Sequence, residues 1–101
     1  MKLVRDKIPQ IIQESGKSCS YHVAGDLEFK ERLFNKMTEE LDEFIEDPCI
    51  EEAADMLEVL FALTEFIEVD FEDVLDTARI KFEKRGGFKN RIILEEVNEI
   101  S

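Results

Sequence analysis

Apolar residues recur along most of this chain at the three- and four-residue spacing that is typical of amphipathic helices. The first stripe falls in residues 8–12, where Pro9 suits a first helical turn, and it ends at Gly16. Residues 18–25 follow as an extended connection. No alternating pattern of useful length predicts a strand, so the expected fold is all-α.

Two longer stripes predict a pair of central helices. The earlier helix has Asp26 as its N-cap and ends near Glu46. The pair Asp47-Pro48 then restarts the helix, as a cap followed by a first-turn proline, and the later stripe reaches Ile67. We therefore expect two long helices joined by a tight turn.

A fourth stripe predicts a final helix that is capped by Asp70 and ended by Gly86-Gly87. Residues 88–101 carry an apolar patch at 92–94 but no clear helical register. The elements together predict about four helices.

The length of 101 residues indicates one domain, residues 1–101, with a modest core to which dimerisation would add buried area. Acidic residues interrupt the most hydrophobic region, so we expect no membrane helix, and no basic and apolar leader opens the chain. Cys19 and Cys49 are too few for a disulfide scaffold and lack zinc-ligand spacing with the single histidine. The expected location is cytoplasmic.

The formal net charge of −12 limits the partners of this chain. A strongly acidic surface repels the phosphate backbone, so binding to a nucleic-acid polymer is not expected. A small phosphorylated ligand remains compatible with this charge, because a divalent metal inverts the local sign of a site.

Carboxylates stand at three-residue spacing on both central helices. Glu40 and Glu43 share one face of the earlier helix, and Glu52 and Asp55 share one face of the later helix. Antiparallel packing of the two helices would bring four anionic oxygen ligands together. Such hard ligands suit Mg²⁺, with coordination positions left for substrate phosphates.

An ordinary solvated acidic face is the alternative interpretation. On a helical wheel of about 100° per residue, Glu52 lies inside the apolar arc of its helix and Glu40 borders the arc of the other. Lys36 is available to pair with Glu40 or Glu43, but residues 39–77 contain no basic residue. Spacing alone fits both interpretations equally, and the placement of Glu52 favours a metal site because a buried carboxylate needs a partner.

A basic cluster ends the fourth predicted helix. Lys81, Lys84 and Arg85 lie on one side of it, where they complement the helix dipole or hold the polyphosphate of a metal-bound nucleotide. Arg5 and Lys7 form a further basic pair. Glycine-rich phosphate loops and EF-hand loops are absent from the sequence.

The run Glu39-Glu40-x-x-Glu43 followed by Glu52-x-x-Asp55 resembles the EExxE…ExxD signature of the all-α nucleotide pyrophosphohydrolases. That superfamily includes MazG, the dimeric dUTPases and phosphoribosyl-ATP pyrophosphohydrolase. The segments 2–9 and 81–88 are similar to a MazG-related subgroup of house-cleaning nucleotide pyrophosphatases, so the resemblance covers almost the whole chain.

The resemblance implies a MazG-like helical bundle that forms a homodimer or homotetramer. It implies a bound Mg²⁺, with Mn²⁺ as the alternative ion. The implied ligands are Glu40, Glu43, Glu52 and Asp55. Glu39 would support these ligands or act as a base for water. The expected reaction is hydrolysis of a nucleoside triphosphate to a monophosphate and pyrophosphate. The residues expected to neutralise charge on the phosphates are Lys81, Lys84 and Arg85.

Two other functions fit the same sequence. One is hydrolysis of phosphoribosyl-ATP in histidine synthesis, which the same metal site would support. The other is a non-enzymatic acidic helical module that binds a basic partner protein.

Overall fold

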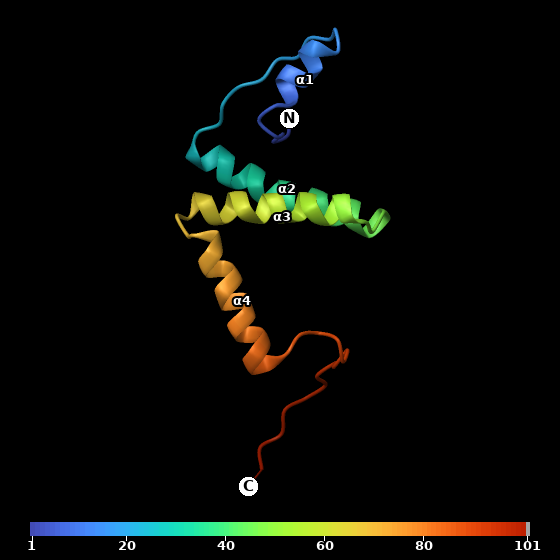
Figure 1. The fold of residues 1–101 in the computed structure, drawn as a ribbon, viewed down its shortest axis with the longest axis vertical. Helices are drawn as coiled ribbons and strands as arrows, with labels where there is room; N and C mark the ends of the chain where they lie inside the picture. Colours follow the sequence, from blue (N-terminus) through green and yellow to red (C-terminus); the bar gives the residue numbers. More distant parts are fainter. Residues whose placement is uncertain (101) are drawn as a thin grey trace. The chain divides into compact units, whose positions relative to one another are not determined.

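The computed structural model describes residues 1–100. Its regular structure consists of the helices α1 (Ile8–Glu14), α2 (Asp26–Glu46), α3 (Ile50–Phe66) and α4 (Phe71–Arg85) (Figure 1). None of the described residues forms a strand, which confirms the expected all-α class. No helix in this part of the chain is long and apolar enough to cross a membrane.

The chain divides into two compact units. The first unit, Met1–Val69, contains α1, α2 and α3, and the second unit begins at Asp70 and contains α4. Within the first unit, α2 and α3 pack against each other, whereas α1 packs against neither of them.

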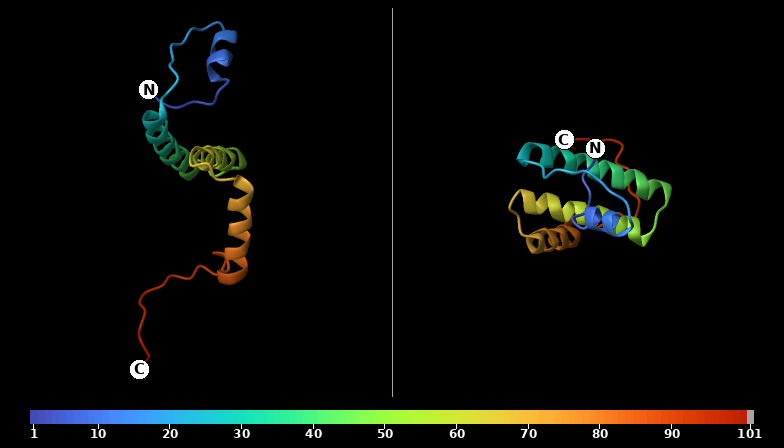
Figure 2. Two further views of the ribbon diagram at one scale, coloured as in Figure 1. Left: turned by 90° about the vertical axis from the view of Figure 1, so that its left-hand side faces the viewer. Right: turned by 90° about the horizontal axis from the view of Figure 1, so that it is seen from above.

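The helices α2 and α3 form an antiparallel hairpin closed by the short connection 47–49. They lie side by side along most of their length, as the right-hand view of Figure 2 shows, and in Figure 1 α3 lies in front of α2. Each helix contributes one buried apolar side chain, Leu33 at 1% exposure and Val59 at 7%. The predicted pairing of two central helices is therefore confirmed.

Two of the predicted helix starts are wrong in detail. Asp26 is the first residue of α2 and not its N-cap, because the Phe29 N–H donates to the carbonyl of Gly25 and thereby makes Gly25 the cap. Asp47 closes α2 and does not open α3, since its own N–H still donates to the Glu43 carbonyl.

The N-cap of α3 is Cys49, in extended backbone. The helix therefore begins at Ile50, and Pro48 lies outside its first turn. Proline fixes φ without requiring a helix to follow, so the same dipeptide fits a turn as well as a helix start.

Both ends of α4 agree with the prediction. The Asp70 side chain accepts a hydrogen bond from the Glu72 N–H at 2.9 Å. Gly86 ends the helix at φ 78°, a conformation that favours glycine. Lys84 and Arg85 occupy its last turn, where positive charge complements the helix dipole.

The substitution Leu33→Ala is expected to lower the free energy of unfolding by about 2–5 kcal/mol, because it removes a fully buried side chain and leaves a cavity. Leu27→Ala on the same helix is the matched control, since Leu27 is 88% exposed, and its effect should stay within about 0.5 kcal/mol. Urea unfolding followed by circular dichroism, at one protein concentration, measures both. Equal effects of the two substitutions would show that Leu33 is not a core residue.

Candidate metal centre

Four carboxylates converge where α2 and α3 pack together: Glu40 and Glu43 from α2, and Glu52 and Asp55 from α3. One ligand oxygen from each residue lies within 4.8 Å of those of the other three. Opposite ligands of a bound Mg²⁺ are about 4.2 Å apart, so small side-chain movements would bring these oxygens onto one ion. The structure thus brings together all four residues that the sequence spacing selects.

The four carboxylates differ in their exposure to solvent. Glu40 is buried at 5% exposure, Glu52 and Asp55 are intermediate, and Glu43 is exposed. The wheel placed Glu52 deeper than Glu40, and the structure reverses this order. A wheel gives the angle of a residue on one helix and cannot include what a neighbouring helix covers.

Two of the carboxylate oxygens are buried without a hydrogen-bond donor. These are Oε2 of Glu40 and Oε2 of Glu52, which no donor among residues 1–100 reaches. Leaving such a group unpaired inside a protein costs about 1–3 kcal/mol, and more when the group is charged. A divalent cation between α2 and α3 would satisfy both oxygens at once, so the residues present fit a metal ion.

Three cations of the first unit contact this group or the neighbouring Glu39. Lys36 Nζ lies 3.1 Å from Glu40 Oε1 and 3.4 Å from Glu39 Oε1. Lys2 also contacts Glu39, at 3.4 Å, and Arg5 Nη2 donates to Asp55 Oδ1 at 2.7 Å. The sequence suggested Glu40 or Glu43 as the partner of Lys36. In the structure Lys36 pairs with Glu40 and with Glu39.

Sequence reasoning missed the contacts of Lys2 and Arg5. These residues lie 37 and 50 positions from their partners and precede the first helix. Helical periodicity therefore gives no information about where they lie. The basic pair of residues 5 and 7 was visible in the sequence, but only the structure connects Arg5 to the carboxylates.

The neighbouring charges change the pKa values of Glu43 and Lys36. The charge of Glu40 and a hydrogen bond shared with it raise the pKa of the Glu43 carboxyl, with smaller contributions from desolvation, Glu52 and Glu39. Burial lowers the pKa of Lys36, but contacts with Glu40 and Glu39 outweigh this effect, and the net result is a raised pKa. Both shifts thus have the same main source, the negative charge of Glu40 and its neighbours.

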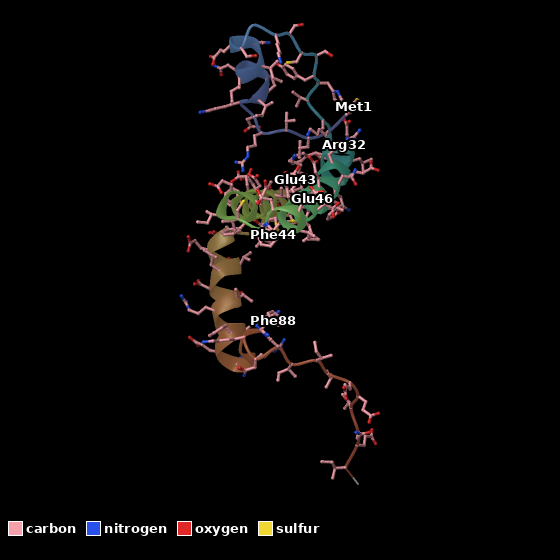
Figure 3. All side chains as sticks on the ribbon, turned by 90° about the vertical axis from the view of Figure 1, so that its right-hand side faces the viewer. Met1, Arg32, Glu43, Phe44, Glu46 and Phe88 are labelled. Atoms are coloured by element: carbon pink, nitrogen blue, oxygen red, sulfur yellow. The ribbon has the colours of Figure 1, made fainter. Side chains whose placement is uncertain are left out.

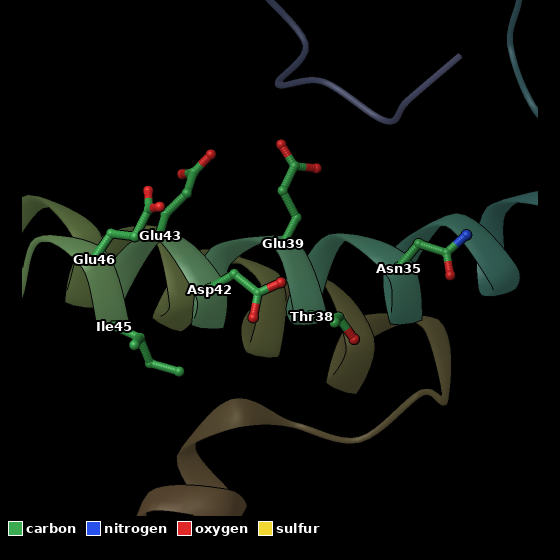
Figure 4. A pocket seen from close by; sticks show the side chains of 7 residues that line it. All are labelled: Asn35, Thr38, Glu39, Asp42, Glu43, Ile45 and Glu46. Carbon is green, nitrogen blue, oxygen red and sulfur yellow. The ribbon is translucent and has the colours of Figure 1, made fainter.

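Glu39 lies outside the group of four and is held by Lys36 and Lys2. In Figure 4 its carboxylate and that of Glu43 point to the same side of α2. The hollow of about 690 Å³ drawn there is lined only by α2 residues, so it is the flank of one helix and not an enclosed site. Glu39 therefore occupies a position beside the candidate ligands.

The predicted phosphate-binding residues belong to the second unit. Lys81, Lys84 and Arg85 lie on α4 and are all exposed. Their role in binding phosphate remains a prediction.

The chain matches no protein-family model, no curated protein and no solved structure.

The substitution Glu43→Gln should stabilise the metal-free protein at pH 7. The raised folded-state pKa of Glu43 means that the folded state binds its proton more tightly than the unfolded state, so stability is lost as pH rises through that pKa. Removing the charge restores this stability at pH 7, and the gain should vanish as pH falls below 4.5, the ordinary value for this carboxyl.

Thermal unfolding in a chelator, from pH 4 to pH 8, measures this effect as a rise in Tm that grows with pH. Glu46→Gln is the control, an exposed carboxylate one turn further along α2 and outside the group of four. A Tm gain for Glu43→Gln that does not change with pH, or that the control reproduces, would contradict the proposed repulsion.

Proposed function

We propose that this protein is an Mg²⁺-dependent nucleoside triphosphate pyrophosphohydrolase that removes non-standard nucleotides. The observation that carries the proposal is the convergence of four carboxylates with two buried, unpartnered oxygens among them, on Glu40 and Glu52. If these carboxylates only formed a solvated acidic surface, we would expect both oxygens to contact water or a hydrogen-bond donor. The resemblance of the acidic motif to the all-α nucleotide pyrophosphohydrolases supplies the reaction class.

An all-oxygen ligand set of this kind suits Mg²⁺, and Mn²⁺ is the alternative ion. When bound, the ion would neutralise the substrate phosphates and stabilise the charge that develops during phosphoryl transfer. The chain itself holds the ligands in register, because each pair stands three residues apart on a packed helix.

In the proposed reaction, the oxygen of a water molecule forms a bond to the α-phosphorus and the bond to the pyrophosphate oxygen breaks. Glu39 is the candidate base that receives the proton of that water. Its contacts with Lys2 and Lys36, both at 3.4 Å, keep it beside the ligands without making it one of them. Lys81, Lys84 and Arg85 are the candidates for contact with the leaving phosphates.

The distribution of apolar surface supports a homodimer or homotetramer. Only Leu33 and Val59 are buried apolar residues in the described chain, while Ile45 and Leu57 on the central helices are 65% and 53% exposed. Helices with so much apolar surface gain stability by covering it, and a second copy of the chain offers a matching surface.

The substitution Glu52→Gln should abolish turnover and weaken Mg²⁺ binding by at least about tenfold, while the fold is retained. Glutamine keeps the size of the side chain but removes a charge from the ligand set. Isothermal titration with MgCl₂ measures binding, circular dichroism measures folding, and pyrophosphate release measures turnover. Glu51→Gln is the control, since Glu51 is exposed and lies outside the group.

If the wild-type protein neither binds Mg²⁺ nor gains stability from it, the proposed function is wrong and an acidic interaction module is favoured. A panel of standard and non-standard nucleoside triphosphates, together with phosphoribosyl-ATP, identifies the substrate by pyrophosphate release. Turnover of phosphoribosyl-ATP alone would contradict the house-cleaning role while leaving the metal chemistry intact.

Light scattering coupled to size-exclusion chromatography should give a mass of two or four times the 11.8 kDa chain. The substitution Ile45→Glu should lower that mass, because it places a charge on exposed apolar surface. A wild-type mass of one chain at micromolar concentration would rule out the homo-oligomer.

A further inference from the structure

Arg5 reaches the candidate metal centre from outside the helical hairpin. Its Nη2 donates to Oδ1 of Asp55 at 2.7 Å, so one of the four candidate ligands already has a cationic partner. The side chains of Arg5 and Asp55 are 56% and 36% exposed, so the contact is a solvent-accessible ion pair. Such pairs contribute little to stability, which means that the guanidinium can leave Asp55 at small cost.

The backbone that carries Arg5 is fixed by other contacts. Arg32 of α2 donates to the carbonyl of Met1 at 3.0 Å, and these two residues are labelled in Figure 3. Lys2 contacts Glu39, and the Arg5 carbonyl accepts from the Ile8 N–H at 3.0 Å. The side chain of Arg5 can therefore change partner while its backbone stays in place beside the centre.

The charges around the centre are consistent with such an exchange. The centre holds five carboxylates, the four candidate ligands and Glu39. Three of them, Glu39, Glu40 and Asp55, form ion pairs with the three cations Lys2, Lys36 and Arg5. With all five ionised, two negative charges remain, which is the charge of one divalent ion. Once that ion binds Asp55, the guanidinium of Arg5 is left without an anionic partner in the centre.

Arg5 also lines a cleft in the first unit. The cleft has a volume of about 520 Å³, within the range of small-molecule sites, and its lining includes Lys2, Arg5, Tyr21, Phe29 and Arg32. A ligand in this cleft would lie beside a guanidinium that is itself in contact with the candidate metal ligand Asp55.

We propose that Arg5 exchanges partners. It neutralises Asp55 when no metal is bound, and it moves to a phosphate group of the substrate when a divalent ion takes Asp55. The proposal rests on the proposed function and assigns a substrate-binding residue to the segment before α1. A guanidinium suits this role because it binds phosphate oxygens in a bidentate manner.

The test measures two ligands separately on the full chain with Arg5→Gln. MgCl₂ alone should bind about two- to fivefold more tightly than to the wild type, because a competing cation is gone. Inorganic pyrophosphate in saturating Mg²⁺ should bind at least about tenfold more weakly, because a charged hydrogen-bond donor is gone. Isothermal titration gives both affinities, and Tm confirms that the variant is folded.

Two further variants control the charge and the segment. Arg5→Lys keeps the charge but loses the bidentate geometry, so Mg²⁺ affinity should stay near the wild type and pyrophosphate affinity should be intermediate. Lys7→Gln removes a charge from the same segment at a residue that forms no ion pair within residues 1–100, and it should change neither affinity by more than about twofold.

Opposite shifts for the two ligands in Arg5→Gln support the exchange. A loss of both affinities would make Arg5 a structural residue and overturn it. If the wild type binds Mg²⁺ and releases pyrophosphate but Arg5→Gln changes neither affinity, the exchange is wrong and the proposed function stands. If the wild type does not bind Mg²⁺ at all, both proposals fail.

Discussion

Electrostatic repulsion between carboxylates at the α2–α3 contact is the constraint on which the rest of the first unit depends. Packing the two helices around Leu33 and Val59 necessarily brings Glu40 and Glu52 out of water. Hydrophobic burial and charge burial therefore occur at the same interface and oppose each other. At Glu52, which forms no ion pair within residues 1–100, glutamine would remove one of the opposing charges without leaving a cation unpaired, so the carboxylate there lowers the stability of the hairpin. This cost is consistent with the function that we propose.

The ion pairs around the centre offset part of this repulsion. Lys36 neutralises the most buried carboxylate from within the same helix, and Arg5 neutralises Asp55 from a segment outside the hairpin. Neither contact reaches the inner oxygens of Glu40 and Glu52. The protein's own cations thus contact the outer oxygens of the centre and leave these two inner oxygens without a donor.

Local features were predictable from the sequence because they depend on neighbouring residues. The helices follow from the apolar period, the Asp70 cap and the Gly86 ending from their chemistry, and the converging carboxylates from the spacing of three. The helix starts near Asp26 and Asp47 were misplaced because a carboxylate suits the first helical turn as well as the N-cap, and because Asp-Pro also occurs in turns outside helices. Only the backbone hydrogen bonds distinguish these positions.

Tertiary features were not predictable in the same way. The contact between Arg5 and Asp55 spans 50 positions and depends on the path of a non-helical segment. The deep burial of Glu40 depends on all the residues packed around it, and a helical wheel of α2 alone does not include those from other segments. The sequence therefore predicts which carboxylates meet, while their cations and their order of burial require coordinates.

The placement of all four candidate ligands within residues 40–55 has a consequence for how the chain folds. Contacts this close in sequence form early, because little loop entropy opposes closure of the α2–α3 hairpin. The same closure brings four like charges together before the distant arginine can arrive. If a divalent ion binds the centre as we propose, its presence during folding would lower this barrier and speed the formation of the hairpin, so the ion would also act as a folding template.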